Sequence, residues 1–131
     1  MKTPKTLLIV DDEESILKSL KRELADTDMT VLLARGGEEA LQVVAQGHVQ
    51  VVLSDNRMPG MSGIELFQKI KKISPGTVRV MMTGYADLSA ALEAINTGEV
   101  YRFFVKPWDN DELLQILTDA MAHSLSDKPV I

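Results

Sequence analysis

The sequence contains no cysteine among its 131 residues, which excludes a disulfide framework and thiolate chemistry. It also lacks any apolar run near the roughly 18 residues that a membrane-spanning helix needs. The polar stretch 1–6 has no apolar segment of the kind found in signal peptides. Basic residues are the minority, 14 against 19 acidic ones, and the net charge is −5. Because a nucleic-acid surface needs a basic patch, we expect no direct nucleic-acid binding. The missing apolar runs lead us to expect a cytoplasmic protein with no membrane contact.

Short apolar runs recur along the chain, and most are rich in β-branched or aromatic residues without strict polar alternation. This composition is typical of strands that are buried on both faces, as in a parallel sheet. The predicted strands are 6–10, 30–34, 50–54, 78–82 and 101–105.

Between the strands, apolar residues follow helical spacing and predict one buried face for each helix. In chain order, these faces consist of Ile16, Leu17, Leu20 and Leu24; Ala40, Leu41, Val44 and Ala45; Leu66, Phe67, Ile70 and Ile73; Leu88, Ala91, Leu92 and Ile95; and Leu113, Leu114, Ile116, Leu117, Ala120 and Met121.

Polar residues ahead of three helices predict where those helices begin. Ser62 followed by Glu65 is a capping-box pattern, and so is Asp109 followed by Glu112. Asp87 is a plausible cap for the fourth helix.

Strand and helix alternate along the whole chain, which predicts right-handed crossovers and a parallel sheet with helices on both sides. The length fits one domain. We assign this domain to residues 1–124 and expect 125–131 to be a polar tail or the start of a linker.

Chemically useful side chains follow four of the five predicted strands. Asp11 and Asp12 follow the first strand, Asp55 the third, Thr83 the fourth and Lys106 the fifth. The carboxyl ends of parallel strands meet at one edge of a sheet, where ligands bind in open α/β folds. We therefore expect these groups to form one site.

Three carboxylates in a small space raise the pKa of at least one of them unless positive charge is nearby. Lys106 and a divalent cation would balance the charge, and oxygen ligands without His or Cys favour Mg²⁺ or Mn²⁺ over zinc. A carboxylate can attack phosphorus and become an aspartyl phosphate, while the cation and the lysine neutralise the phosphoryl oxygens. The Thr83 hydroxyl could also donate to such an oxygen.

Each of these groups has a simpler interpretation when it is taken alone. Asp11 and Asp12 could cap the first helix, and Asp55 could be a turn residue. Thr83 could belong to an ordinary loop, and Lys106 could be a solvated lysine at a strand end. The functional interpretation is favoured because all of the simpler ones would have to coincide at one edge of the sheet.

The order and spacing of the motifs resemble the receiver domain of bacterial two-component response regulators, over about residues 5–124. The resemblance implies a flavodoxin-like (βα)5 fold, a doubly wound five-stranded parallel sheet with strand order 2-1-3-4-5. The matching segments are LLIVDDEE, VVLSDNRMPGMSGIEL, VMMTGYAD and FFVKPWDNDEL.

The same resemblance implies a role for each residue of the acidic site. Asp55 resembles the phosphoacceptor and Asp12 the direct metal ligand, while Asp11 resembles the residue that holds a metal-bound water. Arg57 stands where the family supplies a backbone carbonyl to Mg²⁺. Asp11, Asp12, Asp55 and Arg57 are therefore the expected metal set.

Further roles concern the response to phosphorylation. Thr83 resembles the switch hydroxyl and Lys106 the lysine that pairs with the phosphoryl group, with a cis bond expected between Lys106 and Pro107. Phe103 stands at the switch aromatic, where many relatives have tyrosine, although plain core packing explains it equally well. Tyr101, two residues earlier, is expected on the same face of the strand.

The family tunes the lifetime of the phosphoryl group through two positions, which here are Arg57 and Tyr85. Both side chains are bulky and could obstruct an attacking water. The resemblance therefore implies slower self-dephosphorylation than in relatives with small or acidic groups at these positions.

The expected function is that of a phosphoacceptor in two-component signalling, which catalyses only its own phosphorylation and dephosphorylation. The implied phosphoryl donor is a sensor histidine kinase or a phosphotransfer protein. The implied output surface combines the fourth helix, fifth strand and last helix, and could support a homodimer. Its candidate exposed residues are Glu93, Asn96, Glu99, Arg102 and Trp108, although Trp108 could instead pack on the last helix.

Two arrangements of the chain remain open, a stand-alone receiver and a part of a larger regulator with a C-terminal effector domain. Three other functions compete. A phosphatase of the haloacid dehalogenase type needs a second aspartate where Arg57 stands. A flavin or nucleotide module needs a phosphate-binding loop after the first strand, where 11–14 is acidic. A pseudo-receiver would lack some of the expected site residues.

Overall fold

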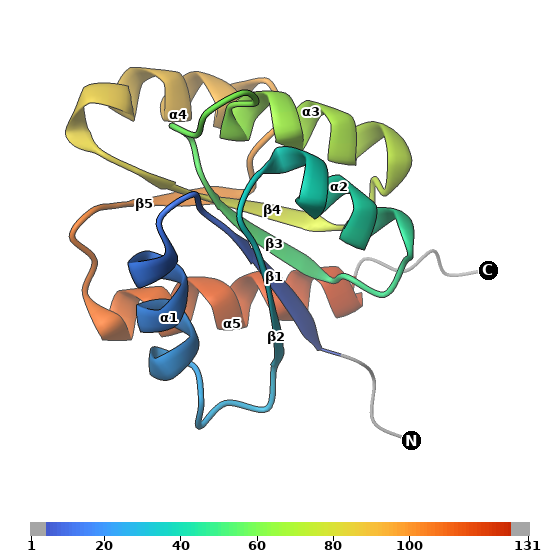
Figure 1. Cartoon of the computed structure of the whole chain (residues 1–131), viewed down its shortest axis with the longest axis vertical. Coiled ribbons are helices and arrows are strands. Elements are labelled where there is room, and N and C mark those ends of the chain that lie inside the picture. The colour runs from blue at the N-terminus through green and yellow to red at the C-terminus, as the bar shows by residue number, and fades with distance from the viewer. Residues whose placement is uncertain (1–4, 127–131) are drawn as a thin grey trace.

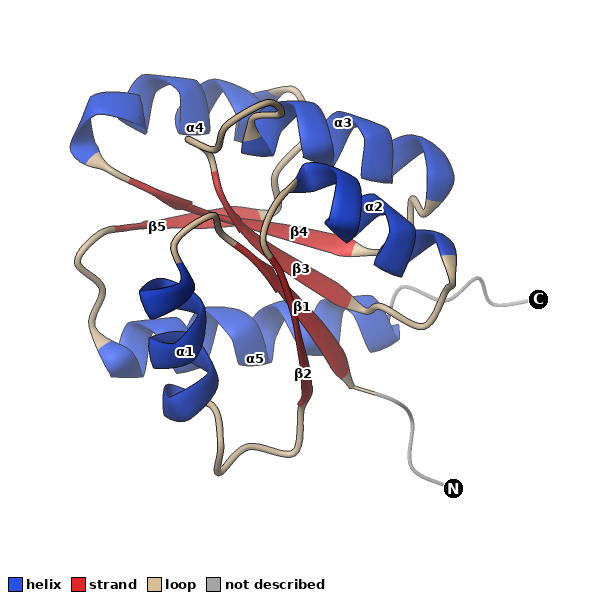
Figure 2. Ribbon diagram, viewed as in Figure 1, coloured by secondary structure: helices blue, strands red, loops and turns tan. Residues whose placement is uncertain are grey.

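The structure is a computed structural model that describes the backbone of residues 5–126 and the side chains of residues 5–124. A central sheet lies between two layers of helices (Figure 1, Figure 2). The strands are β1 (Thr6–Val10), β2 (Thr30–Ala34), β3 (Val51–Asp55), β4 (Val78–Thr83) and β5 (Arg102–Val105). The helices are α1 (Glu14–Glu23), α2 (Gly37–Ala45), α3 (Gly63–Ile73), α4 (Leu88–Asn96) and α5 (Asn110–Ser126), with a short 3₁₀ turn η1 (Tyr85–Asp87) before α4.

All neighbouring strands pair in parallel, in the order β2-β1-β3-β4-β5. The predicted flavodoxin-like topology is therefore confirmed. Helices α1 and α5 cover one face of the sheet, and α2, α3 and α4 cover the other (Figure 1). A separate apolar core fills each of the two interfaces between sheet and helices.

The observed strands place the carboxyl ends slightly differently from the prediction. β1 and β2 have the predicted bounds, β3 is shifted by one residue toward the C-terminus, β4 ends one residue later, and β5 begins one residue later. Asp55 and Thr83 are therefore the last residues of their strands, and Asp55 pairs with Met82 in the register between β3 and β4. Strand pairing fixes the backbone at these two positions, so their side chains start from the ordered edge of the sheet.

The expectation of full burial holds for the central strands and is wrong for the two edge strands. Every residue of β3 is buried, whereas β2 and β5 each bury a single residue and leave several partly exposed. Leu32 in β2 is 38% exposed. The reason is topological, since β2 and β5 lie at the edges, where helices cover them less completely.

Most of the predicted helix faces are buried, but Ile73, Leu92 and Ala45 are exposed. Ile73 is 53% exposed and Leu92 is 50% exposed. Ile73 is the last residue of α3, beyond the helix's contact with the sheet. In α4 the buried positions are Ala91 and Ala94, so Leu92 points to another side of the helix.

The helix starts agree only in part with the predicted caps. The capping box of Ser62 and Glu65 is confirmed, with Ser62 Oγ accepting from the Glu65 N–H at 3.1 Å. Asp109 accepts from the N–H of Asp111 at 2.7 Å, two residues along the chain instead of three. Asp87 occupies the N-cap position of α4, but its carboxylate makes no capping hydrogen bond within the described chain.

At the C-terminal end, α5 continues to Ser126. The remaining part of the predicted tail, 127–131, lies outside the described residues. Within the described part of the chain, no helix combines the length and apolar character that crossing a bilayer requires.

Candidate functional site

Three aspartates meet at the carboxyl edge of the sheet, as the sequence predicts. Asp11 and Asp12 follow β1, and Asp55 ends β3. Each offers a carboxylate oxygen, and these oxygens all lie within 4.8 Å of one another. Asp11 is fully buried and Asp55 is 8% exposed. Asp12 is partly exposed, so two of the three carboxylates are largely shielded from water that would otherwise screen their charge.

Backbone hydrogen bonds hold the turn that carries Asp11. Its N–H donates to the Ala34 carbonyl at 3.1 Å, which extends the pairing of β1 with β2 by one residue. Its Oδ1 accepts from the N–H of Glu13 at 2.9 Å. The simpler interpretation of Asp11, a cap for the first helix, is thus partly correct, but this contact engages only one of its two oxygens.

The second carboxylate oxygen of Asp11, Oδ2, lacks a hydrogen-bond donor within the described residues. Oδ2 is buried and accepts no hydrogen bond from any residue in the described chain. Burial raises the pKa of Asp11 to about 6, the N–H of Glu13 opposes that rise, and the charge on Asp55 adds to it. A buried acceptor without a donor, grouped with two more carboxylates, fits a hard divalent cation that prefers oxygen ligands.

Lys106 brings the nearby positive charge. Its Nζ lies 3.1 Å from Asp55 Oδ2 and 3.9 Å from Asp11 Oδ2. The bond between Lys106 and Pro107 is cis, as predicted. One ammonium group cannot balance three carboxylates, so this edge remains a site for further positive charge.

Thr83 ends β4 and is fully buried. Its hydroxyl donates to the carbonyl of the next residue, Gly84, at 3.2 Å. This is a long hydrogen bond within the hydroxyl's own loop, and another acceptor could replace it.

Tyr101, just before β5, and Phe103, within β5, pack on different faces of the sheet. Phe103 is partly buried and packs into the core beneath α2, α3 and α4. Tyr101 packs against the opposite core and stacks on His123 of α5, with ring centroids 4.7 Å apart. The expectation that these two residues share a face is wrong, because β5 begins at Arg102 and strand alternation does not reach Tyr101.

Trp108 is partly buried and packs edge-on against Phe104 with ring centroids 6.0 Å apart. It belongs to the core that includes α5, in agreement with the packed interpretation. Of the other candidates for the output surface, Glu93, Asn96 and Arg102 are exposed and Glu99 is partly exposed.

The two predicted lifetime residues lie in the loops that flank the acidic cluster. Tyr85 is 78% exposed. Arg57 points its guanidinium at Asp87, with Nε 2.7 Å from Oδ2, and this hydrogen-bonded carboxylate raises the pKa of Arg57. The pair joins residues 30 positions apart, and nothing in the sequence marks Asp87 as the partner of Arg57.

Two residues that position the loop after Asp55 were not predicted. Asn56 accepts from the N–H of Ile64 through its Oδ1 at 3.2 Å, at the start of α3. A Cβ added to Gly63 would lie 2.5 Å from the backbone oxygen of Asp55. Only glycine allows this approach. The signal available in the sequence was a glycine directly after the predicted cap Ser62.

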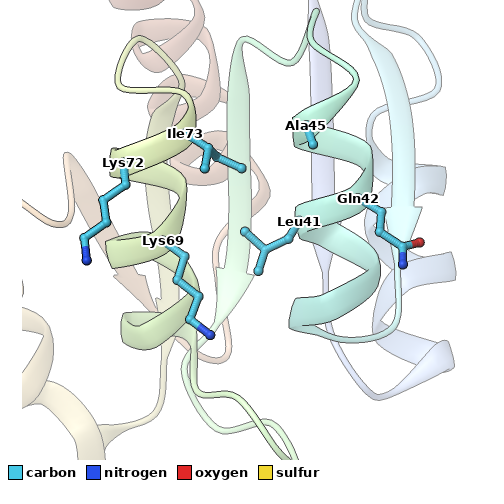
Figure 3. A pocket seen from close by; sticks show the side chains of 6 residues that line it. All are labelled: Leu41, Gln42, Ala45, Lys69, Lys72 and Ile73. Atoms are coloured by element: carbon cyan, nitrogen blue, oxygen red, sulfur yellow. The ribbon is translucent and has the colours of Figure 1, made fainter.

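The apolar hollow in Figure 3 is a different feature. It has a volume of about 410 Å³ and lies between α2 and α3, lined by Leu41, Gln42, Ala45, Lys69, Lys72 and Ile73. It contains no carboxylate and none of the predicted site residues. The acidic cluster therefore remains the candidate site.

Comparison with known proteins gives a consistent result. The family model of the response regulator receiver domain matches residues 7–118. Over 121 residues the chain is 37% identical to the transcriptional regulatory protein GlrR of Escherichia coli, which covers 92% of this chain and 27% of that protein. It is 37% identical over 115 residues to the DNA-binding transcriptional regulator NtrC of the same species, covering 88% of this chain and 24% of NtrC. The chain thus spans about a quarter of the length of these curated relatives.

Solved structures agree with these matches. The signal receiver domain of an HD domain-containing protein from Pseudomonas fluorescens superposes with a TM-score of 0.89 at 38% identity, covering 97% of this chain and 93% of that one. The receiver domain of NtrX from Brucella abortus gives a TM-score of 0.82 at 29% identity, covering 88% and 98%.

Proposed function

Because this chain belongs to the response regulator receiver domain family, we propose that Asp55 is its phosphoacceptor in two-component signalling. The observation that carries the proposal is the surroundings of Asp55. Its carboxylate stands at the end of β3, 3.1 Å from the ammonium of Lys106 and grouped with two further carboxylates. It is the member of the cluster that is both paired with Lys106 and slightly open to solvent.

The cation that this cluster fits is Mg²⁺ or Mn²⁺. The carboxylates of Asp11, Asp12 and Asp55 and the backbone carbonyl of Arg57 would hold it. When bound, such an ion supplies positive charge to the oxygens of a transferring phosphoryl group. Oδ2 of Asp11 supports this assignment, because this buried oxygen accepts no hydrogen bond from the described part of the chain and Lys106 Nζ approaches it only to 3.9 Å.

The chemical step is an in-line displacement at phosphorus. An Asp55 oxygen forms the new bond to phosphorus, and the bond between phosphorus and the donor's leaving group breaks with its electron pair going to that group. Lys106 orients the Asp55 carboxylate before the reaction and pairs with a phosphoryl oxygen afterwards. Both roles need only a small movement, because the ammonium already lies beside Asp55.

The response begins at Thr83. Its hydroxyl donates to Gly84 in the structure, and a phosphoryl oxygen is a stronger acceptor than a peptide carbonyl. We expect the hydroxyl to turn toward Asp55 and to move the loop 84–87. Phe103 packs on the same side of the sheet as α4, so its rotamer would respond to that movement. The surface formed by α4, β5 and α5 would then change as the output.

The implied partners follow from the family and from the longer relatives. A sensor histidine kinase or a phosphotransfer protein would donate the phosphoryl group. GlrR and NtrC are transcriptional regulators, and this chain matches about a quarter of the length of each. In a protein of that type, a C-terminal effector domain would follow residues 125–131. Homodimerisation through α4, β5 and α5 is a further part of this proposal.

The experiment is incubation with a small acyl phosphate and Mg²⁺, followed by intact mass. We expect a gain of one phosphoryl group that is abolished by chelator and by Asp55→Asn. Asp28→Asn, an exposed aspartate paired with Lys5, is the matched control and should gain the same mass. A phosphoryl group on Asp55→Asn would contradict the assignment. Turnover of a small phosphate ester would instead favour a phosphatase.

A further inference from the structure

The ion pair between Arg57 and Asp87 connects the two loops that flank Asp55. Arg57 belongs to the loop after the acceptor strand, and Asp87 ends the turn η1 that follows Thr83. The Arg57 side chain is 71% exposed, whereas that of Asp87 is only 18% exposed. The contact distance is 2.7 Å. The pair therefore holds the moving loop of the proposed switch against the loop of the acceptor.

This contact keeps Asp87 from a second role. Asp87 is the N-cap residue of α4, and aspartate is among the best capping residues. Within the described chain, however, its side chain caps no N–H group of α4, and the first turn of α4 contains no acidic residue. The first N–H of that turn, from Leu88, donates to the Tyr85 carbonyl of η1, and the next N–H groups lie too early in α4 to have an acceptor inside the helix. Asp87 stands at the N-cap position with φ −108° and ψ 10°, outside the extended region usual for a cap, and its carboxylate faces Arg57 instead.

Arg57 also has a competing attraction. The negative charge of Asp55 acts on its guanidinium in addition to that of Asp87. Phosphorylation would raise the charge at Asp55 from one to about two and add strong acceptor oxygens. A guanidinium binds such oxygens through two parallel hydrogen bonds. Because the Arg57 side chain is 71% exposed, water screens its pair with Asp87 on that side, and the guanidinium is free to exchange one oxyanion for another.

We propose that Arg57 exchanges partners on phosphorylation, leaving Asp87 for the phosphoryl group on Asp55, and that the released Asp87 carboxylate then caps α4. This inference rests on the proposed function and extends it. It makes Asp87 a positioning residue that acts through Arg57. It also gives the start of α4 a direct response to the state of Asp55, separate from the one that passes through Thr83.

The first test needs no phosphoryl donor. Amide hydrogen exchange of Ser89 and Ala90, in the first turn of α4, reports whether that turn is capped. In chelator, Arg57→Gln should slow exchange at these amides about fivefold relative to wild type, because Asp87 is free to cap. Asp87→Asn should do the same, since asparagine caps as well as aspartate but cannot hold Arg57 as an ion pair. Asp87→Ala should show no slowing.

The matched control is Lys5→Gln, which removes an ion pair of the same 2.7 Å length at the start of β1. It should leave the α4 amides unchanged. If Arg57→Gln exchanges like wild type at these two positions, Asp87 does not cap when it is released and the proposal is wrong, whatever happens at Asp55.

The second test adds a small acyl phosphate and Mg²⁺. Wild type should now show the slower exchange that Arg57→Gln shows in chelator, and Asp87→Ala should again show none. A wild-type protein that gains the phosphoryl mass while its α4 amides stay unchanged overturns the exchange and leaves the proposed function intact. A wild-type protein that never gains the phosphoryl mass overturns both the proposed function and the partner exchange. The chelator experiment still reports separately whether the ion pair with Arg57 prevents Asp87 from capping α4.

Discussion

The backbone N–H of Lys106 donates to the carbonyl oxygen of Thr83 at 2.8 Å, one step past the end of β5. This hydrogen bond thus fixes the backbones that carry the ammonium and the hydroxyl relative to each other before either side chain meets a phosphoryl group. Each can change its hydrogen-bond partner by side-chain rotation, without movement of the sheet.

Thr83→Ala should separate phosphorylation from its consequence. The variant should still gain one phosphoryl mass, because Asp55 and Lys106 remain. Loss of the hydroxyl removes its contact with Gly84, at a cost of about 1 kcal/mol in the free energy of unfolding. Amide exchange in the loop 84–87 should respond much less to phosphorylation than in wild type. An equal response in both proteins would show that the hydroxyl does not drive the loop.

Lys106→Ala should slow phosphorylation by a small acyl phosphate about 100-fold, the cost of removing one preorganised charge from a transferring group. The rate of mass gain under saturating Mg²⁺ measures the effect. Lys72→Ala, at the apolar hollow between α2 and α3, is the control and should react at the wild-type rate. A comparable loss in both variants would indicate a general effect of surface charge.

Asp11→Asn should stabilise the metal-free protein. Burial raises the pKa of Asp11 from 3.8 to about 6, so the folded state holds this proton more tightly than the unfolded chain does. Above pH 6, where Asp11 is ionised in both states, it lowers the free energy of unfolding by its full amount. This destabilisation becomes smaller as the pH falls from 6 toward 3.8, the pKa of Asp11 in the unfolded chain. In chelator, urea unfolding should show a gain on the order of 2 kcal/mol near pH 7.5 and little gain near pH 4.

With Mg²⁺ present the order should reverse, because the variant loses a ligand and with it the stabilisation that comes from the bound ion. If Asp11→Asn is less stable than wild type in chelator at pH 7.5, the buried carboxylate is better satisfied than its surroundings indicate.

The double variant Arg57→Asn, Tyr85→Glu should lose its phosphoryl group faster than wild type. Two bulky side chains at the mouth of the site would be replaced by a short one and by a carboxylate that can orient an attacking water. We expect roughly a tenfold increase in the dephosphorylation rate. The decay of the phosphorylated mass after removal of the donor measures it. Faster decay in wild type would refute the assignment of Arg57 and Tyr85 as lifetime residues.

The sequence predicted the acidic edge well because that edge follows from topology. Once the apolar runs are interpreted as parallel strands, their carboxyl ends must lie together. Asp11, Asp55, Thr83 and Lys106 are then neighbours without further knowledge of packing. The parallel sheet followed from strand and helix alternation in the same way, while the strand order came from the family resemblance.

Contacts between loops could not be predicted in this way. Asp87 has the local pattern of a helix cap, and only the folded chain shows that Arg57 takes its carboxylate. The local sequence pattern also could not predict which apolar residues are buried at the edges of the helix layers. Leu92 follows helical spacing as well as Ala91 does, and which of them meets the sheet depends on the rotation of α4 against its neighbours.

The close approach of Gly63 to the peptide of Asp55 limits how this domain can be engineered. Only a hydrogen atom fits between the first turn of α3 and the Asp55 carbonyl oxygen, and Gly63 donates back to the Asn56 carbonyl at 2.9 Å. The segment 56–63 is therefore a closed loop whose two end residues are hydrogen-bonded to each other. Chimeras that graft this loop from another protein would have to preserve both its length and its terminal glycine, which leaves substitutions inside the loop as the practical route to new kinetics.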